Sequence, residues 1–328
     1  MKLAFVYAGQ GSQKVGMGKD FCEEYPEFNE TMTKASDLIK DITDCDVKKL
    51  CLEGPMEELS QTRYTQPCMV AYAVGVTDLL KDKGIFPEYA MGLSLGEYSA
   101  IYAAESISKE DVIPLVAYRG KVMTEAVSGR EVKMSAVLMV EREVVLDCCA
   151  KACEQLSDEK VVINGIESDE SYVVQATNFN CPGQIVISGD AKAVDTATEL
   201  LKEAGAKKIM PLPVSGPFHT KLMKPAGDKL REKLDTIDFK EPKAQIICNT
   251  TGKAKDDASF AEILEKQVQS SVYLEDSIRF LAEQGVDTII EIGPGNTISK
   301  FVKKTAGDIT VYSIDSVEDF KTVVEKLA

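Results

Sequence analysis

The chain has 328 residues, of which 44% are hydrophobic and 28% are charged, as is typical of a globular protein with a full hydrophobic core. Acidic residues outnumber basic ones by 53 to 38, and the formal net charge of -15 disfavours a nucleic acid or an anionic membrane as the main partner. His219 is the single histidine, which excludes any metal site or catalytic centre built on two or more imidazoles.

The cysteines and the N-terminal residues indicate a cytoplasmic protein. Nine cysteines are scattered along the chain without a C-x-x-C motif, a pattern that favours reduced thiols over a disulfide framework. The N-terminal apolar run reaches a glycine-rich turn too early for a signal peptide. No uncharged apolar run is long enough to span a bilayer. We therefore expect a cytoplasmic localisation and no membrane partner.

The first predicted strand, Leu3–Tyr7, leads into a glycine-rich turn at 9–13, with the sequence GQGSQ. Glycines allow backbone amides to approach a ligand closely, so this turn can present the amide of Gln10 to a substrate. A phosphate-binding P-loop is excluded, because the Gly-Lys-Ser/Thr ending of that motif is absent.

The sharpest local motif is G-L-S-L-G at 92–96, which lies between a predicted short strand and a helix. This is the pattern of a nucleophile elbow, a turn so tight that only small residues fit on either side of the serine. It would project the Ser94 hydroxyl from the strand end. It would also place the Leu95 amide at a helix N-terminus, where negative charge is stabilised. The alternative is an ordinary strand-to-helix turn with an N-capping serine.

The middle of the chain has a different order of predicted strands and helices, which indicates an inserted subdomain at 128–208. Strands are expected at 133–140, 171–176 and 184–188, and an acidic helix at 142–156 lies between the first two. A repeated strand-helix-strand order over a segment of this length is typical of a small ferredoxin-like α+β unit.

His219 follows a Gly-Pro loop beyond this insertion. Serine is a weak nucleophile unless a base removes its proton, and His219 is the obvious candidate to activate Ser94. The order of serine before histidine agrees with an α/β-hydrolase-like topology. No acidic residue is evident as a third member, and a lone histidine can also be purely structural.

Three further apolar runs, at 245–248, 288–292 and 309–314, read as buried parallel strands. Together with the first strand they predict an α/β fold with an α/β-hydrolase-like core and a mostly parallel sheet. We assign this large catalytic domain to residues 1–127 and 209–328.

Taken together, the motifs resemble those of malonyl-CoA:acyl carrier protein transacylases and of the related acyltransferase domains of polyketide and fatty acid synthases. The resemblance covers nearly the whole chain. The blocks that carry it, in the order of the family, are GQGSQ at 9–13, TQP at 65–67, GLSLGEYSA at 92–100, YRGKVM at 118–123, NFNCPGQIVISG at 178–189, VSGPFHT at 214–220, NTTG at 249–252 and EIGPG at 291–295.

The resemblance implies a role for particular residues of this chain. The nucleophile falls on Ser94 and the base on His219. Arg119 falls where the family grips the free carboxylate of the malonyl group, and a guanidinium fork matches a carboxylate bidentately; the alternative is a solvated charge on a helix face. The remaining positions are Gln10 and Leu95 for the oxyanion-hole amides, Gln267 for the carbonyl that orients the histidine, and Met123, Asn180 and Phe218 for substrate binding.

Two positions depart from the family pattern. Leu93 replaces the histidine that usually precedes the nucleophile, which affects acyl-group selectivity or rate, and Ala8 replaces a proline before the glycine-rich turn. Phe218, directly before His219, resembles malonyl-selective members of the family.

The resemblance implies a ping-pong transfer of malonyl from malonyl-CoA to acyl carrier protein in fatty acid biosynthesis, by a monomer that needs no metal or cofactor. Because acyl carrier proteins are acidic, docking requires a local basic rim. Lys207, Lys208, Lys221 and Lys224 flank the His219 segment and are expected to supply part of it, unless they form only a solvated face. The alternatives for function are a trans-acting acyltransferase or acyl hydrolase of a polyketide pathway, and a non-catalytic module that binds a carrier protein.

Overall fold

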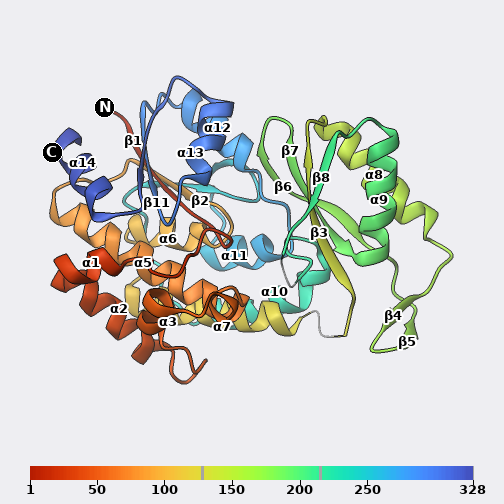
Figure 1. Cartoon of the computed structure of the whole chain (residues 1–328), viewed down its shortest axis with the longest axis horizontal. Helices are drawn as coiled ribbons and strands as arrows, with labels where there is room; N and C mark the ends of the chain where they lie inside the picture. Colours follow the sequence, from red (N-terminus) through yellow and green to blue (C-terminus); the bar gives the residue numbers. More distant parts are fainter. Residues whose placement is uncertain (127–128, 214–215, 328) are drawn as a thin grey trace.

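The computed structural model describes residues 1–126, 129–213 and 216–327, which form two sheets with their own helices (Figure 1). The predicted domain boundary at 127 and 128, and the first two residues of the VSGPFHT block, lie outside the described residues.

The larger of the two sheets, counted over the described residues, has six strands in the order β10-β9-β2-β1-β11-β12, and all neighbours are parallel except β10 and β9. In chain order its five parallel strands follow the sequence 3-2-1-4-5, which is the arrangement of a doubly wound α/β sheet. The strand bounds are β1 (Leu3–Tyr7), β2 (Tyr89–Gly92), β9 (Gln245–Cys248), β10 (Lys253–Ala254), β11 (Thr288–Ile292) and β12 (Thr310–Ile314).

Helices cover both faces of this sheet, so its strands are buried on both sides and read as continuous apolar runs. On β1, Ala4 and Val6 pack toward α12 and α13, whereas Phe5 and Tyr7 pack toward the cluster that includes α5, α6 and α7. The helix bounds in this part are α1 (Lys19–Glu24), α2 (Pro26–Ile39), α3 (Val47–Glu53), α4 (Met56–Leu59), α5 (Thr62–Asp82), α6 (Gly96–Ala103), α7 (Lys109–Glu125), η1 (a 3-10 turn, Lys221–Met223), α10 (Lys224–Leu234), α11 (Phe260–Val268), α12 (Leu274–Glu283), α13 (Thr297–Thr305) and α14 (Val317–Leu327).

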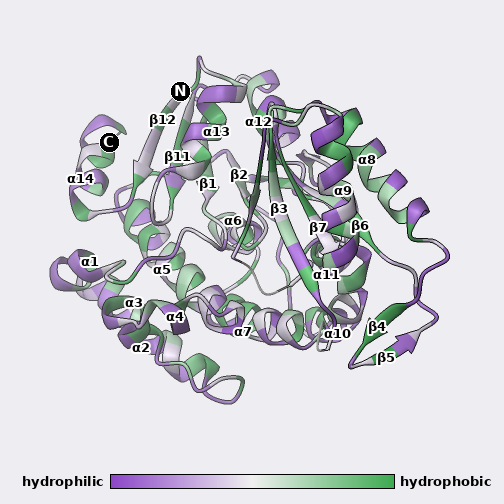
Figure 2. Cartoon of the chain, turned by 45° about the vertical axis from the view of Figure 1, so that its right-hand side comes forward, coloured by the Kyte–Doolittle hydropathy of each residue, from purple (hydrophilic) through white to green (hydrophobic). Residues whose placement is uncertain are grey.

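The smaller sheet, formed by described residues between 132 and 211, has four antiparallel strands in the order β6-β7-β3-β8 (right-hand side of Figure 1). One face packs on two amphipathic helices, in which hydrophilic and hydrophobic residues alternate (Figure 2). The bounds are β3 (Val132–Leu138), α8 (Arg142–Gln155), β6 (Val174–Cys181), β7 (Gln184–Asp190), α9 (Ala191–Glu203) and β8 (Lys208–Pro211).

A hairpin that the sequence analysis did not predict extends from this part of the molecule (Figure 1). Its strands are β4 (Val161–Ile163) and β5 (Ile166–Ser168). Val162 and Ile166 are exposed there. None of the described helices combines the length and the apolar character needed to cross a membrane.

The two sheets are held together next to the predicted site. Phe179 N donates to the carbonyl of Val272 over 2.9 Å, and Val272 N donates to the carbonyl of Thr177 over 2.8 Å. Arg142 on α8 also forms a bidentate pair with Asp276 on α12, with N–O distances of 3.2 and 2.7 Å. The carboxyl ends of β1 and β2 therefore face a fixed wall provided by the smaller sheet.

Candidate active site

Ser94 stands on the sharp turn that connects β2 with α6, and its backbone has a φ of 53°. This left-handed conformation is uncommon for a residue with a side chain, and such conformations cluster at functional sites. A Cβ atom on Gly92 would overlap with the backbone of Gly96, and one on Gly96 would overlap with the carbonyl of Tyr7. The predicted elbow is therefore present: Gly92 is required by the tightness of the turn itself, and Gly96 by its close approach to β1.

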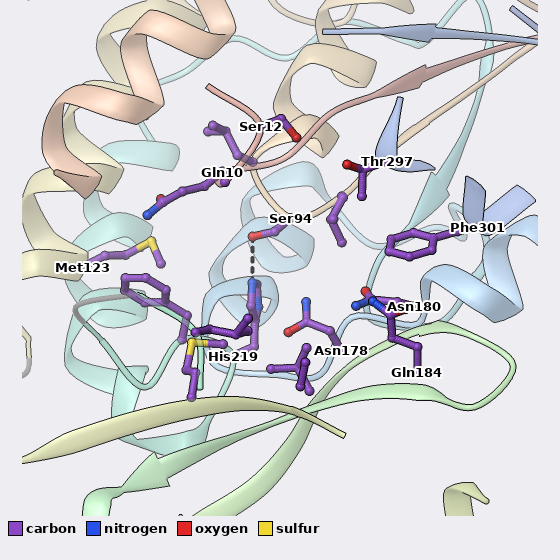
Figure 3. A pocket seen from close by; sticks show the side chains of 18 of the residues that line it. Gln10, Ser12, Ser94, Met123, Asn178, Asn180, Gln184, His219, Thr297 and Phe301 are labelled. Carbon is purple, nitrogen blue, oxygen red and sulfur yellow. Dashed lines mark hydrogen bonds between the residues drawn. The ribbon is translucent and has the colours of Figure 1, made fainter. Parts of the chain in front are cut away.

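The Ser94 hydroxyl and His219 meet directly: Oγ and Nε2 are 2.7 Å apart (Figure 3). The other ring nitrogen, Nδ1, lies 2.8 Å from the carbonyl oxygen of Gln267 and 3.2 Å from that of Ser270. Carbonyl oxygens only accept hydrogen bonds, so Nδ1 carries the proton and the lone pair of Nε2 faces the serine. This is the arrangement of a serine with its general base.

The surroundings of His219 keep the imidazole neutral. Burial, aided by the positive charge of Arg119, lowers the pKa of His219 to about 4, although the bonds to the two carbonyl oxygens oppose this shift. At neutral pH the ring is therefore free to accept a proton from Ser94.

Arg119, on α7, lies at the bottom of the same site and is only 1% exposed. Its Nη2 donates to Ser94 Oγ over 3.1 Å and to Gln267 Oε1 over 3.0 Å, and its guanidinium carbon lies 5.2 Å from the centre of the Tyr98 ring. Among the described residues its Nε has no hydrogen-bond partner, and no carboxylate lies within ion-pair distance. The alternative of a solvated charge on a helix face is therefore wrong, because the side chain is buried. A buried cation without an anionic partner is unfavourable, so the site favours a ligand that supplies an anion.

A cavity of about 280 Å³ opens beside these groups, between the carboxyl ends of β1 and β2 and the smaller sheet (Figure 3). Every residue assigned to the site from the sequence lines it, except Gln267, which lies behind His219. Among its described lining residues Arg119 is the only permanently charged one. The lining residues are Gln10, Gly11, Ser12, Leu93, Ser94, Leu95, Arg119, Met123, Met134, Ala136, Asn178, Asn180, Gln184, Val186, Leu212, Phe218, His219, Thr297 and Phe301.

Three polar groups on the cavity wall are available to a substrate. The backbone amides of Gln10 and Leu95 donate to no acceptor in the described part of the chain. The side-chain oxygen of Asn180 is buried and likewise accepts no hydrogen bond from any described residue. In contrast, the side chain of Gln10 is occupied, because Nε2 donates to Thr62 Oγ1 over 2.9 Å.

The four lysines that flank the His219 segment are exposed, but they fall into two groups. Lys207 and Lys208 border a groove of about 590 Å³ that shares Met134 and Leu212 with the cavity at Ser94. The other two, Lys221 and Lys224, border a separate groove with no residue in common with that cavity.

Comparisons with known proteins agree with this geometry. A family model described as "Acyl transferase domain" matches residues 4–323. A malonyl CoA-acyl carrier protein transacylase of Bacillus subtilis is 39% identical over 327 residues, which are 99% of this chain and 97% of that protein. The chain belongs to the malonyl CoA-acyl carrier protein transacylase family. Another member, from Haemophilus influenzae, is 37% identical over 329 aligned positions, covering 99% of both chains.

Solved structures of the transacylase family share the fold. The crystal structure of the enzyme from Streptococcus pneumoniae superimposes with a TM-score of 0.88 at 40% identity, covering 99% of this chain and 100% of that one. A malonyl-transacylase solved in complex with a type II polyketide synthase acyl-carrier protein superimposes with a TM-score of 0.89 at 34% identity, covering 99% and 100%.

Two polar residues of this transacylase site were not assigned a role from the sequence. Glu97, in the first turn of α6, accepts hydrogen bonds from Gln267 and Asn249. Asn249 in turn accepts from the amide of Ser94. Both residues lie in blocks that carry the family resemblance, GLSLGEYSA and NTTG, but nothing in one linear sequence shows that the two blocks meet.

Proposed function

We propose that this chain transfers the malonyl group of malonyl-CoA to the phosphopantetheine thiol of an acyl carrier protein in fatty acid biosynthesis, through a malonyl ester on Ser94. Its relatives are named malonyl CoA-acyl carrier protein transacylases. The observation that carries the proposal is the buried guanidinium of Arg119, which lies beside the Ser94–His219 pair without an anionic partner in the described residues. An acyl group that brings its own carboxylate suits this site.

In the first half-reaction Nε2 of His219 takes the hydroxyl proton while Oγ of Ser94 attacks the thioester carbonyl. The free amides of Gln10 and Leu95 are the donors available to the oxyanion that forms. The carbon–sulfur bond then breaks, and the imidazolium returns the proton to the CoA thiolate. Arg119 holds the malonyl carboxylate and so fixes the acyl group in one orientation.

In the second half-reaction the thiol of the carrier protein replaces CoA. His219 takes the thiol proton, the sulfur attacks the malonyl ester, and Oγ of Ser94 leaves with the proton from the imidazolium. Transfer competes with hydrolysis, so water must be kept from the ester. The apolar residues Met123, Leu212 and Phe218 on the cavity wall serve this purpose.

The fold supports a finer description. We propose that the small subdomain is ferredoxin-like, because its strands follow the repeated strand-helix-strand order and both helices lie on one face. The likeness of the large domain, 1–127 and 209–328, to α/β-hydrolases rests on the elbow after β2 and on the order of serine before histidine. Since β8 pairs with β3 as far as Pro211, the second junction fits better after that residue than after 208.

We further propose that the acidic carrier protein docks at Lys207 and Lys208 rather than at the other two lysines. The groove that they border shares Met134 and Leu212 with the wall of the cavity at Ser94, so a carrier protein bound there would lie close to the cavity that the phosphopantetheine arm must enter. Charge complementarity with an acidic partner is expected to act mainly on the rate of association.

Acyl loading tests the proposed function. Incubation with malonyl-CoA followed by intact-mass analysis should show one malonyl adduct on the protein and none on the Ser94→Ala variant. Addition of acyl carrier protein should then move the malonyl group to the carrier. Release of free malonate without transfer would indicate a hydrolase instead, and the absence of an adduct would indicate a non-catalytic module.

A further inference from the structure

Glu97 is a buried carboxylate that the mechanism above does not use. It lies in the first turn of α6, directly behind the elbow, and is 0% exposed. No lysine or arginine in the described part of the chain lies within ion-pair distance of it. Instead its two oxygens accept one hydrogen bond each from groups on other elements: Oε2 from Gln267 Nε2 at 2.7 Å, and Oε1 from the backbone amide of Asn249 at 3.1 Å.

The first of these bonds fixes the side chain of Gln267. A carboxylate only accepts hydrogen bonds, so the NH₂ end of the amide must point to Glu97, where it also donates to the carbonyl of Ser94 over 2.6 Å. The oxygen end must then face Arg119, which donates to it over 3.0 Å. The backbone carbonyl of the same residue accepts from Nδ1 of His219. One glutamine therefore connects the carboxylate with the cation and with the base.

The second bond fixes Asn249, which holds the elbow from the other side. Its Oδ1 accepts from the amide of Ser94 over 2.7 Å, and its Nδ2 donates to the carbonyl of Gly92 over 2.7 Å. The two oxygens of Glu97 thus bind two residues that each hydrogen-bond to the backbone of the elbow. Hydrogen bonds to a buried ionised group are stronger than neutral ones, so protonation of the carboxylate would weaken its hold on both residues.

We propose that Glu97 is the positioning residue of this active site: its ionised carboxylate holds Gln267 and Asn249 and thereby sets the orientation of Arg119, His219 and Ser94. This inference rests on the proposed function, because it assigns a role in acylation of Ser94. When ionised, Glu97 places a negative charge one glutamine side chain away from Arg119, which offsets part of the cost of the buried cation before a malonyl carboxylate arrives.

A dependence of acylation on pH follows. The titratable and charged groups near Glu97 are Arg119 on α7, Tyr98 on α6 and Cys248 on β9. Burial raises the pKa of Glu97 to about 7, although the bonds from Gln267 and Asn249 and the charge of Arg119 oppose this. Below that pH the Glu97 carboxylate binds a proton, so it loses its negative charge and one of its two oxygens becomes a donor. Because burial lowers the pKa of His219 to about 4, we expect protonation of Glu97, and not of His219, to reduce acylation below about pH 7.

The test compares single-turnover acylation by malonyl-CoA and acetyl-CoA across pH in the full chain and in the Glu97→Gln variant, normalised to the fraction of Ser94 that can be acylated. The amide has nearly the same shape, but its NH₂ end must face one of the two donors, Gln267 Nε2 or Asn249 N. We expect acylation by both substrates to fall roughly 10- to 100-fold, and the acid limb near pH 7 to disappear.

Glu291→Gln is the matched control. Glu291 is also 0% exposed, accepts hydrogen bonds from the amides of Ile298 and Ser299, and does not line the cavity. Loss of a buried carboxylate should lower the melting temperature of both variants, but only Glu97→Gln should change the pH profile.

Two results would overturn the inference. One is a Glu97→Gln variant whose normalised acylation rate and pH profile match those of the unchanged chain. The other needs no variant: an acid limb of the unchanged chain with its midpoint near pH 4, the value to which burial lowers the pKa of His219. If the unchanged chain forms no acyl adduct on Ser94, the proposed function itself has failed, which is a separate outcome.

Discussion

Replacing Arg119 by alanine separates its proposed role in binding the malonyl carboxylate from its hydrogen bonds to Ser94 and Gln267. The guanidinium is 1% exposed and has no anionic partner among the described residues, so the malonyl carboxylate would bind it in a largely desolvated site. Truncating one partner of such a pair costs about 3 kcal/mol. This corresponds to a loss on the order of 100-fold in kcat/KM for malonyl-CoA.

Acetyl-CoA gives the internal comparison, because its acyl group has no carboxylate. The Arg119→Ala variant removes a buried cation that an acetyl group cannot neutralise, so loading of acetyl should stay the same or improve. The assay measures initial rates of Ser94 acylation from both thioesters by intact mass, and the preference for malonyl should fall on the order of 100-fold. Arg119→Lys keeps the charge without the planar fork and should give an intermediate preference.

Equal losses for the two substrates would refute this reasoning. Nη2 of Arg119 also donates to Ser94 Oγ and to Gln267 Oε1, at 3.1 and 3.0 Å. If those bonds were its whole contribution, removal of the side chain would slow every acyl group alike and leave the preference unchanged.

Three further predictions test the remaining assignments. Lys207→Glu combined with Lys208→Glu should raise the KM for carrier protein several-fold at low ionic strength and spare acylation by malonyl-CoA, whereas Lys221→Glu should change neither; equal effects would exclude the groove as the docking site. Leu93→His adds a hydrogen-bond donor to an apolar part of the cavity wall and should raise the malonyl preference up to about tenfold, measured with the same two thioesters. Gly96→Ala forces a methyl group against the carbonyl at the end of β1 and should cost about 1–3 kcal/mol in the free energy of unfolding, measured by chemical denaturation.

The parts of the fold that the sequence predicted well are those that depend on local pattern. The strands at 245–248 and 288–292 have the predicted bounds, because a strand buried on both faces is a continuous apolar run. In the smaller sheet β6 runs from 174 to 181 rather than from 171 to 176. Its second half contains asparagines that face the active-site cavity, and these polar residues interrupt the apolar pattern on which the prediction relied.

The candidate site shows the same limit. Ser94 and His219 were assigned from an elbow motif and a family resemblance, and the structure brings their side chains together. The burial of Arg119 was not evident from the sequence, since it results from the packing of α7 against the rest of the core. Glu97 and Asn249 were missed for a related reason. Their roles depend on hydrogen bonds between blocks that are distant in the chain, and local spacing does not reveal such contacts.

The backbone from Gln267 to Val272 contacts both His219 and the smaller sheet. The carbonyl oxygens of Gln267 and Ser270 accept hydrogen bonds from the His219 ring. At the end of the segment, the backbone of Val272 forms hydrogen bonds with β6 of the smaller sheet. A displacement of the smaller sheet would therefore be transmitted to His219 through this short backbone segment. The sheet at which we propose that the carrier protein docks and the imidazole that we propose as the base are therefore joined by one short segment of backbone, so we expect a substitution that moves one of them to disturb the other.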